Sequence, residues 1–171
     1  MSFIPTGRAL LDAEKILSEI GLLPRMTYMD FGCGNVGHFV LPGARLVGNE
    51  GKVYAVDILK KALEGVDRRA VCAGLDNIVT IWGNFERPRG VPVASDSMRV
   101  ISLIHLTNLL IESPFVIEEV KRLLQDRGLF LVIDWKERQK DRIISLLTAG
   151  GFQREKSFEA GPYHWGLLFS R

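Results

Sequence analysis

The chain has little cysteine, no long apolar run and no excess of charge of either sign, and each absence excludes a class of protein. Cys33 and Cys72 are too few for a disulfide framework, so we expect reduced thiols in a cytoplasmic protein. The longest apolar stretch, residues 100–110, is interrupted by polar side chains, and residues 1–8 do not resemble a signal peptide, so we expect no membrane segment. Lysine and arginine (22) nearly balance aspartate and glutamate (20), which argues against nucleic-acid binding through bulk charge.

The composition is that of an ordinary globular protein. Hydrophobic residues make up 47% of the 171 positions and charged residues 25%, which supplies enough apolar surface for a well-buried core. The length suits one domain better than two, so we expect residues 1–171 to form a single domain.

Residues 27–37 are the most informative stretch of the sequence. A short apolar run and Asp30 lead into Gly32, Gly34 and Gly37 at the spacing G-x-G-x-x-G, and apolar residues resume at Phe39. This order predicts a strand, a tight loop and a helix. Glycine tolerates positive φ and lets a ligand lie against bare backbone, and the free N–H groups of the following helix point toward that ligand. The spacing alone is a weak signal, because an ordinary strand-to-helix turn could use the same residues.

Six more segments have the pattern of strands, and helical patterns separate most of them. This alternation predicts a parallel sheet covered on both faces. The last two strands are joined only by Ala160, Gly161 and Pro162, which predicts a hairpin with an antiparallel final strand. The fold class is therefore α/β with a seven-stranded, mostly parallel sheet. The predicted strands are residues 27–31, 52–57, 78–82, 98–103, 129–134, 153–159 and 164–170.

Apolar spacing and start and stop residues predict five helices. We expect Pro42 and Gly43 to interrupt or bend the second one. We expect Gly128 to end the fourth one by adopting a left-handed conformation. The predicted helices are residues 6–20, 38–47, 58–73, 117–125 and 141–149.

Two polar residues end neighbouring predicted strands, at the edge where parallel sheets bind ligands. Asp57 lies twenty residues beyond Gly37, where a carboxylate can accept both hydroxyl groups of an adenosine ribose. It could also cap the helix that follows, and the two roles are compatible. The amide oxygen of Asn84 could accept the amine of adenine, or Asn84 could be a simple turn residue. Together the two positions favour a nucleoside-type ligand.

With these residues in place, the chain resembles the class I S-adenosylmethionine-dependent methyltransferases over nearly its whole length. Residues 30–37 look like their first motif, Asp57 matches the ribose-binding acid, and Gly83-Asn84-Phe85 matches the adenine-contacting site. Residues 120–130 resemble the family's helix, turn and fifth strand, and residues 149–152 with the last two strands resemble its closing hairpin. The resemblance implies a Rossmann-like three-layer sandwich, S-adenosylmethionine as cofactor, and methyl transfer. Because the sequence shows no appended recognition domain, we expect a small-molecule acceptor.

The resemblance also implies roles for individual residues. The backbone of residues 32–34 would cradle the methionine part, and Asp30 would orient that loop or reach the ammonium group through water. Leu103 and Ile104 would form the floor near the methyl group. Two residues depart from the family pattern: Arg99 stands where an Asp is usual, and Asn84 replaces the common Asp while keeping an acceptor oxygen. The expected cofactor-binding residues are Asp30, Gly32, Cys33, Gly34, Gly37, Asp57, Ile58, Asn84, Phe85 and Leu103.

His105, just past the fourth predicted strand, is the candidate catalytic base, because an imidazole titrates near neutral pH, although a structural role is also open. Besides a methyltransferase, two other functions stay open. A nicotinamide-dependent oxidoreductase could use the glycine pattern and Asp57 alone, and Arg99 would suit a non-catalytic scaffold that keeps the cofactor. We expect no metal, nucleic-acid or membrane partner. The sequence does not identify the acceptor or the oligomeric state.

Overall fold

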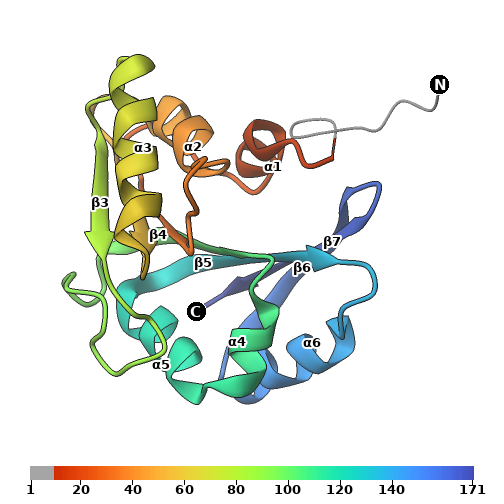
Figure 1. Ribbon diagram of the computed structural model, residues 1–171. Helices are drawn as coiled ribbons and strands as arrows, with labels where there is room; N and C mark the ends of the chain where they lie inside the picture. Colours follow the sequence, from red (N-terminus) through yellow and green to blue (C-terminus); the bar gives the residue numbers. More distant parts are fainter. Residues whose placement is uncertain (1–9) are drawn as a thin grey trace.

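The computed structural model describes residues 10–171, which form a seven-stranded sheet between two layers of helices (Figure 1). The strand order is β3-β2-β1-β4-β5-β7-β6. Neighbouring strands are parallel except at β7, which is antiparallel to both β5 and β6. The predicted fold class is confirmed. The strands are β1 (Thr27–Phe31), β2 (Lys52–Asp57), β3 (Ile78–Trp82), β4 (Met98–Ile104), β5 (Leu124–Trp135), β6 (Gln153–Gly161) and β7 (His164–Ser170).

The strand order reverses between β1 and β4. From β1 the chain moves outward through β2 and β3, and then returns to pair β4 with the other side of β1. Asp30 is in register with Ala55 on one side and with Ser102 on the other. The loops that follow β1, β2 and β4 therefore open at the same edge of the sheet, which is where such folds bind ligands.

Each face of the sheet carries its own hydrophobic core. Successive strand residues point to opposite faces, so Tyr28 packs in one core and Met29 and Phe31 in the other. Both cores are filled by the buried sides of three helices, which Figure 1 shows on either side of the sheet. One face carries α1 (Ala13–Glu19), α2 (Val40–Val47) and α3 (Lys60–Cys72), and the other carries α4 (Thr107–Glu112), α5 (Pro114–Leu123) and α6 (Lys140–Ala149).

The first two helices differ from their predictions. α1 begins only at Ala13, because Asp12 caps it by accepting a hydrogen bond from the Lys15 N–H at 3.2 Å. The predicted start at residue 6 falls among residues 6–9, which lie outside the described part of the chain. The predicted interruption of α2 was wrong. Pro42 lies in the first turn, where a missing N–H removes no helical hydrogen bond, so the helix runs through it.

The segment between β4 and β5 departs most from prediction. The sequence pattern missed α4, and α5 spans residues 114–123 instead of 117–125. The expectation that Gly128 is left-handed was also wrong, since Arg127 adopts the positive φ of 56°. Glycine is still needed at 128 for another reason: a Cβ there would lie 2.8 Å from the Gln125 carbonyl oxygen and 2.9 Å from the Leu124 side chain. Close packing, not backbone conformation, explains this glycine.

Candidate functional site

The glycine loop turns sharply back toward β2 at the end of β1. Gly32, Gly34 and Gly37 have φ values of 69°, 60° and 61°, a region that other residues adopt only with strain. The N–H groups of Gly32 and Cys33 both donate to the Val56 carbonyl oxygen, at 2.8 and 3.1 Å. The loop is therefore anchored to β2, and the three glycines allow the left-handed backbone conformations that the predicted tight turn needs.

Asp57 connects this loop to the end of β2. One carboxylate oxygen accepts the Gly34 N–H at 3.1 Å, and the other accepts the Leu59 N–H at 2.9 Å at the start of α3. The side chain is 8% exposed, so it faces the loop and keeps a small accessible surface. The structure thus shows the capping role that the sequence allowed, and it places the carboxylate beside the glycine loop.

Asp30 lies beneath the loop in a chain of three buried polar groups. The Ser102 hydroxyl donates to Asp30 at 2.5 Å, and the Tyr28 hydroxyl lies 2.6 Å from the same Ser102 oxygen. Burial raises the pKa of Asp30 to about 7, against the lowering effect of these hydrogen bonds, and the nearby Asp57 adds to the rise. Asp30 therefore carries only part of a negative charge at neutral pH, and a cation at the loop would favour its ionised form.

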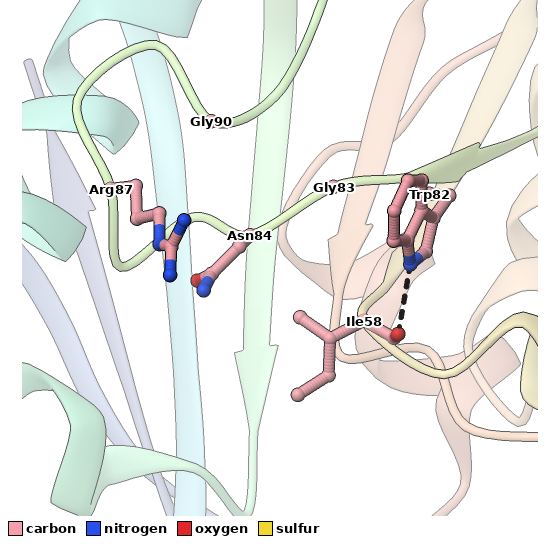
Figure 2. Close-up of a pocket in the computed structure, with 6 residues that line it drawn as sticks. All are labelled: Ile58, Trp82, Gly83, Asn84, Arg87 and Gly90. Carbon is pink, nitrogen blue, oxygen red and sulfur yellow. Dashed lines mark hydrogen bonds between the residues drawn. The ribbon is translucent and has the colours of Figure 1, made fainter.

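A cavity of about 400 Å³ opens at the ends of β2 and β3. Figure 2 shows Asn84 and Arg87 reaching toward one another from one wall, with Ile58 extending from the opposite wall. The Trp82 indole N–H donates to the Ile58 carbonyl oxygen at 3.0 Å and holds these two strand ends together. The Asn84 side-chain oxygen accepts the Glu86 N–H at 2.9 Å, so its turn role is observed, and Asn84 also lines the cavity.

Phe85 supports this cavity from inside the protein. Its ring is 4% exposed and stacks on Phe31 with ring centroids 4.5 Å apart. The side chain is therefore part of the core, so a ligand contact of the kind the sequence analysis expects would have to come from the Phe85 backbone.

A buried ion pair fixes the far wall of the same cavity. The carboxylate of Glu119, which is 2% exposed, accepts the N–H groups of Arg89 and Val91 at 3.2 and 3.1 Å. The same carboxylate accepts two hydrogen bonds from Arg122, at 2.7 and 2.9 Å. Arg122 in turn donates to the carbonyl oxygens of Val91 and Val93 at 2.9 and 2.7 Å. We call Glu119 and Arg122 the loop clamp, because they hold residues 89–93 to α5.

The loop clamp was missed by the sequence analysis. Gly90, which lines the cavity, lies between the two clamped N–H groups, so the clamp sets the position of that wall. The only sequence signal was a Glu and an Arg three positions apart on a helix, a spacing that is also common on solvated helix surfaces.

A second cavity of about 210 Å³ lies against the glycine loop. Its lining includes Asp30, Gly32, Cys33, Ile104 and His105. Burial raises the pKa of the Cys33 thiol, which keeps it protonated and argues against a nucleophilic role. Leu103 is completely buried in the core and does not reach this cavity. Strand alternation explains the difference, because Ile104 points to the opposite face from Leu103.

His105 lies at the mouth of the second cavity in an unusual conformation. Its φ of 60° is rare for a residue other than glycine, and its N–H donates to the Ile133 carbonyl oxygen at 2.9 Å. The imidazole stacks on Trp135 with ring centroids 4.9 Å apart, and lies equally close to the buried ring of His164. Partial burial lowers the pKa of His105, and His164 lowers it further. The imidazole is therefore neutral, and able to accept a proton, at neutral pH.

Most predicted site residues thus surround the glycine loop. Asp30, Gly32, Cys33 and His105 line the smaller cavity. Ile58 and Asn84 line the larger one, and Asp57, which precedes Ile58, is bonded to the Gly34 N–H of the loop. Among residues 10–171, no three His, Cys, Asp or Glu side chains are grouped so that they could hold a metal ion. None of the helices in this part of the chain combines the length and the apolar character needed to cross a bilayer.

Comparison with known proteins identifies one family. A family profile described as a methyltransferase domain matches residues 22–156. The crystal structure of an S-adenosylmethionine-dependent methyltransferase from Aquifex aeolicus is 25% identical and superposes with a TM-score of 0.86, over 98% of this chain and 93% of that one. An S-adenosylmethionine-dependent O-methyltransferase from Thermotoga maritima shares the fold at 15% identity, with a TM-score of 0.77 over 100% of this chain and 67% of that one.

A curated relative also matches part of the sequence. It is the aklanonic acid methyltransferase DauC of Streptomyces sp. strain C5, which is 34% identical over 94 residues. The match covers 54% of this chain and 39% of DauC, so the chain aligns with about two fifths of that relative's length.

Proposed function

The chain belongs to the methyltransferase domain family and uses S-adenosylmethionine, and from this premise we propose that it methylates a small molecule, with the cofactor spanning the two cavities across the glycine loop. The name of the partial relative DauC supports a small-molecule acceptor, since it describes a methyltransferase of aklanonic acid. The single observation that carries the assignment of the site is the Asp57 carboxylate, which accepts the Gly34 N–H of the glycine loop and directly precedes Ile58 in the wall of the larger cavity.

In this arrangement the larger cavity receives the adenosine part. Asp57 would accept the ribose hydroxyl groups, the Ile58 side chain would cover one face of the adenine ring, and Asn84 with the Phe85 N–H would contact its edge. The volume of about 400 Å³ supports this, because it falls within the range of pockets for small ligands. Gly37 would act through the loop conformation, since its positive φ starts the turn into α2.

The methionine part would lie over Gly32, Cys33 and Gly34, with its ammonium group toward Asp30. A positive charge there would favour the ionised form of Asp30 and lower its raised pKa, so cofactor binding near neutral pH would release protons. The sequence analysis expected both Leu103 and Ile104 to form the floor near the methyl group. Only Ile104 lines the smaller cavity, so in this proposal Ile104 alone lies beside the methyl group.

Methyl transfer is an in-line displacement in which the sulfonium supplies a good leaving group, so the protein mainly has to align donor and acceptor. His105 would serve as the base for an acceptor that loses a proton. Its neutral imidazole and its place in the lining of the smaller cavity support this role. We also propose a cytoplasmic location, supported by the free thiols of Cys33 and Cys72.

Calorimetry with S-adenosylmethionine tests the proposed site. We expect the wild-type protein to bind the cofactor and Asp57→Asn to bind it at least tenfold more weakly, which is about 1.4 kcal/mol for the loss of a charged hydrogen-bond acceptor. Asp76→Asn is the matched control, because Asp76 is an exposed residue in the turn after α3. Equal affinity of the Asp57→Asn and wild-type proteins would refute the assignment of the ribose site.

A further inference from the structure

We propose that the methyl acceptor carries an anionic group, such as a carboxylate, and that a third cavity between α4 and the start of α6 binds it. This inference rests on the proposed function, because it assigns the cavity to the acceptor of the same reaction. Figure 1 shows α4 and α6 side by side on one face of the sheet. The cavity between them measures about 210 Å³, and its lining includes Asn108, Ile111, Glu112, Arg138, Gln139 and Arg142.

The charge of this cavity favours an anion. Two arginines, Arg138 and Arg142, and one acidic residue, Glu112, line it, which gives the lining a net charge of +1. Within residues 10–171, neither arginine lies within ion-pair distance of an acidic side chain. Arg142 donates one hydrogen bond to the Gln139 side-chain oxygen at 3.2 Å, which orients it and leaves its other donors available.

The chemistry of arginine narrows the type of anion. A guanidinium group offers paired N–H donors that match the two oxygens of a carboxylate, and it stays charged at every physiological pH. Arg138 and Arg142 are both exposed, so water screens their charges in part. Two such groups at one cavity still attract a carboxylate, and a neutral ligand of the same shape does not receive that contribution. The exposed amide of Asn108 adds a further donor at the same cavity.

The position of the cavity connects it to the site of methyl transfer. His105 lines the cavity beside the glycine loop, and Thr107, only two residues later, lines the arginine cavity. The start of α4 is held in place there, since the Thr107 N–H and hydroxyl both donate to the buried carboxylate of Asp134 at the end of β5. An acceptor lying across residues 105–107 would therefore place its nucleophilic atom near the cofactor and its anionic group between the two arginines.

The experiment uses benzoate as the probe and the full-length protein saturated with S-adenosylhomocysteine. Benzoate is titrated in a ¹H–¹⁵N NMR experiment that follows the side-chain amides of Asn108 and Gln139. We expect saturable shifts of these signals with benzoate and none with benzamide, which has the same shape without the charge. In the double variant Arg138→Gln/Arg142→Gln we expect the benzoate affinity to fall about tenfold or more, about 1.4 kcal/mol. Arg154→Gln, an exposed arginine on β6, is the control and should bind benzoate as the wild type does.

The outcomes separate this inference from the proposed function. Calorimetry with S-adenosylmethionine on the same proteins should give equal affinities for the wild type and the double variant, because neither arginine contacts the glycine loop or the larger cavity in this assignment. Cofactor binding without benzoate binding, or benzoate binding unchanged in the double variant, would overturn the inference and leave the proposed function standing. Absence of cofactor binding to the wild type would refute the proposed function and, with it, the acceptor role of the arginine cavity.

Discussion

Replacing Glu119 by glutamine tests whether the loop clamp both stabilises the fold and shapes the adenosine cavity. Glutamine keeps the size of the side chain and one acceptor oxygen, but turns the other oxygen into an NH₂ group facing donors. The carboxylate accepts four hydrogen bonds, from Arg89 N–H, Val91 N–H and twice from Arg122. The substitution therefore removes two of them and leaves the Arg122 guanidinium without its counter-charge.

The expected loss of stability follows from the burial of the pair. A hydrogen bond to a charged group contributes about 1.5–3 kcal/mol, and breaking a buried ion pair by removing one partner costs about 3–5 kcal/mol. Side-chain exposure is 2% for Glu119 and 16% for Arg122, so water screens the glutamate hardly at all and the arginine slightly. We therefore expect a loss of about 3 kcal/mol in the free energy of unfolding, at the lower end of that range.

Urea denaturation measures this loss, and calorimetry measures its effect on the cofactor. We expect S-adenosylmethionine to bind Glu119→Gln about tenfold more weakly, because the wall at Gly90 loses its anchor. The control is Arg25→Gln, which breaks the 3.0 Å ion pair between Arg25 and Glu50. Because these two side chains are 75% and 70% exposed, the loss should lower the free energy of unfolding by less than about 1 kcal/mol. A Glu119→Gln protein as stable as the control would refute the energetic argument, and unchanged cofactor affinity would refute the link to the cavity.

Three further predictions concern the loop and its neighbours. Gly65→Ala should destabilise the protein by about 1–3 kcal/mol in urea denaturation, despite alanine's better helix propensity, because the new Cβ would lie 2.6 Å from the carbonyl oxygen of Asn35 in the glycine loop. The pKa of Asp30 is about 7 in the folded protein against a usual 3.8, so the folded state binds its proton more tightly than the unfolded state does. The stability that this difference contributes is present at low pH and is lost as the pH rises from about 4 to 7. Asp30→Asn should remove that part of the pH dependence of the free energy of unfolding. For an acceptor that must lose a proton, His105→Gln should lower kcat by about 10²–10⁴-fold. With S-adenosylmethionine saturating, so that Asp30 stays ionised, the wild-type kcat/KM for the acceptor should fall only below about pH 6.5, because the pKa of His105 is lowered. A wild-type profile independent of pH would contradict the base role.

The fold and the central loop were predictable because they depend on local patterns. Three glycines at fixed spacing determine where the chain turns after β1, and Asp57 follows from its place at the end of β2. Gly34 and Asp57 meet because β1 and β2 are parallel neighbours that end at the same edge of the sheet. The alternation of strands and helices indicates the parallel sheet, and the structure supplies the order that makes β1 and β2 neighbours.

The parts that sequence reasoning missed depend on contacts between distant segments. The loop clamp joins residues about 30 positions apart, and its glutamate becomes buried only when α5 packs beside the loop before β4. The face of the sheet to which each β4 side chain points is a similar case. Because Leu103 and Ile104 are both apolar, composition does not show which one faces the cavity, and only the register with β1 decides it.

The start of α4 links all three parts of the proposed reaction, and this explains why a strained residue precedes it. Leu106 lies over the glycine loop so closely that a Cβ on Gly32 would be 2.2 Å from its Cδ1 atom. The left-handed φ of His105 directs the chain from the end of β4 into this position, and Thr107 is then fixed by Asp134. A methionine part resting on Gly32 must displace the flexible end of Leu106, so cofactor binding would alter the surface between the methyl group and the arginine cavity. The strained backbone costs about 1–3 kcal/mol, and it brings one short segment to the cofactor loop, the proposed base and the proposed acceptor cavity together.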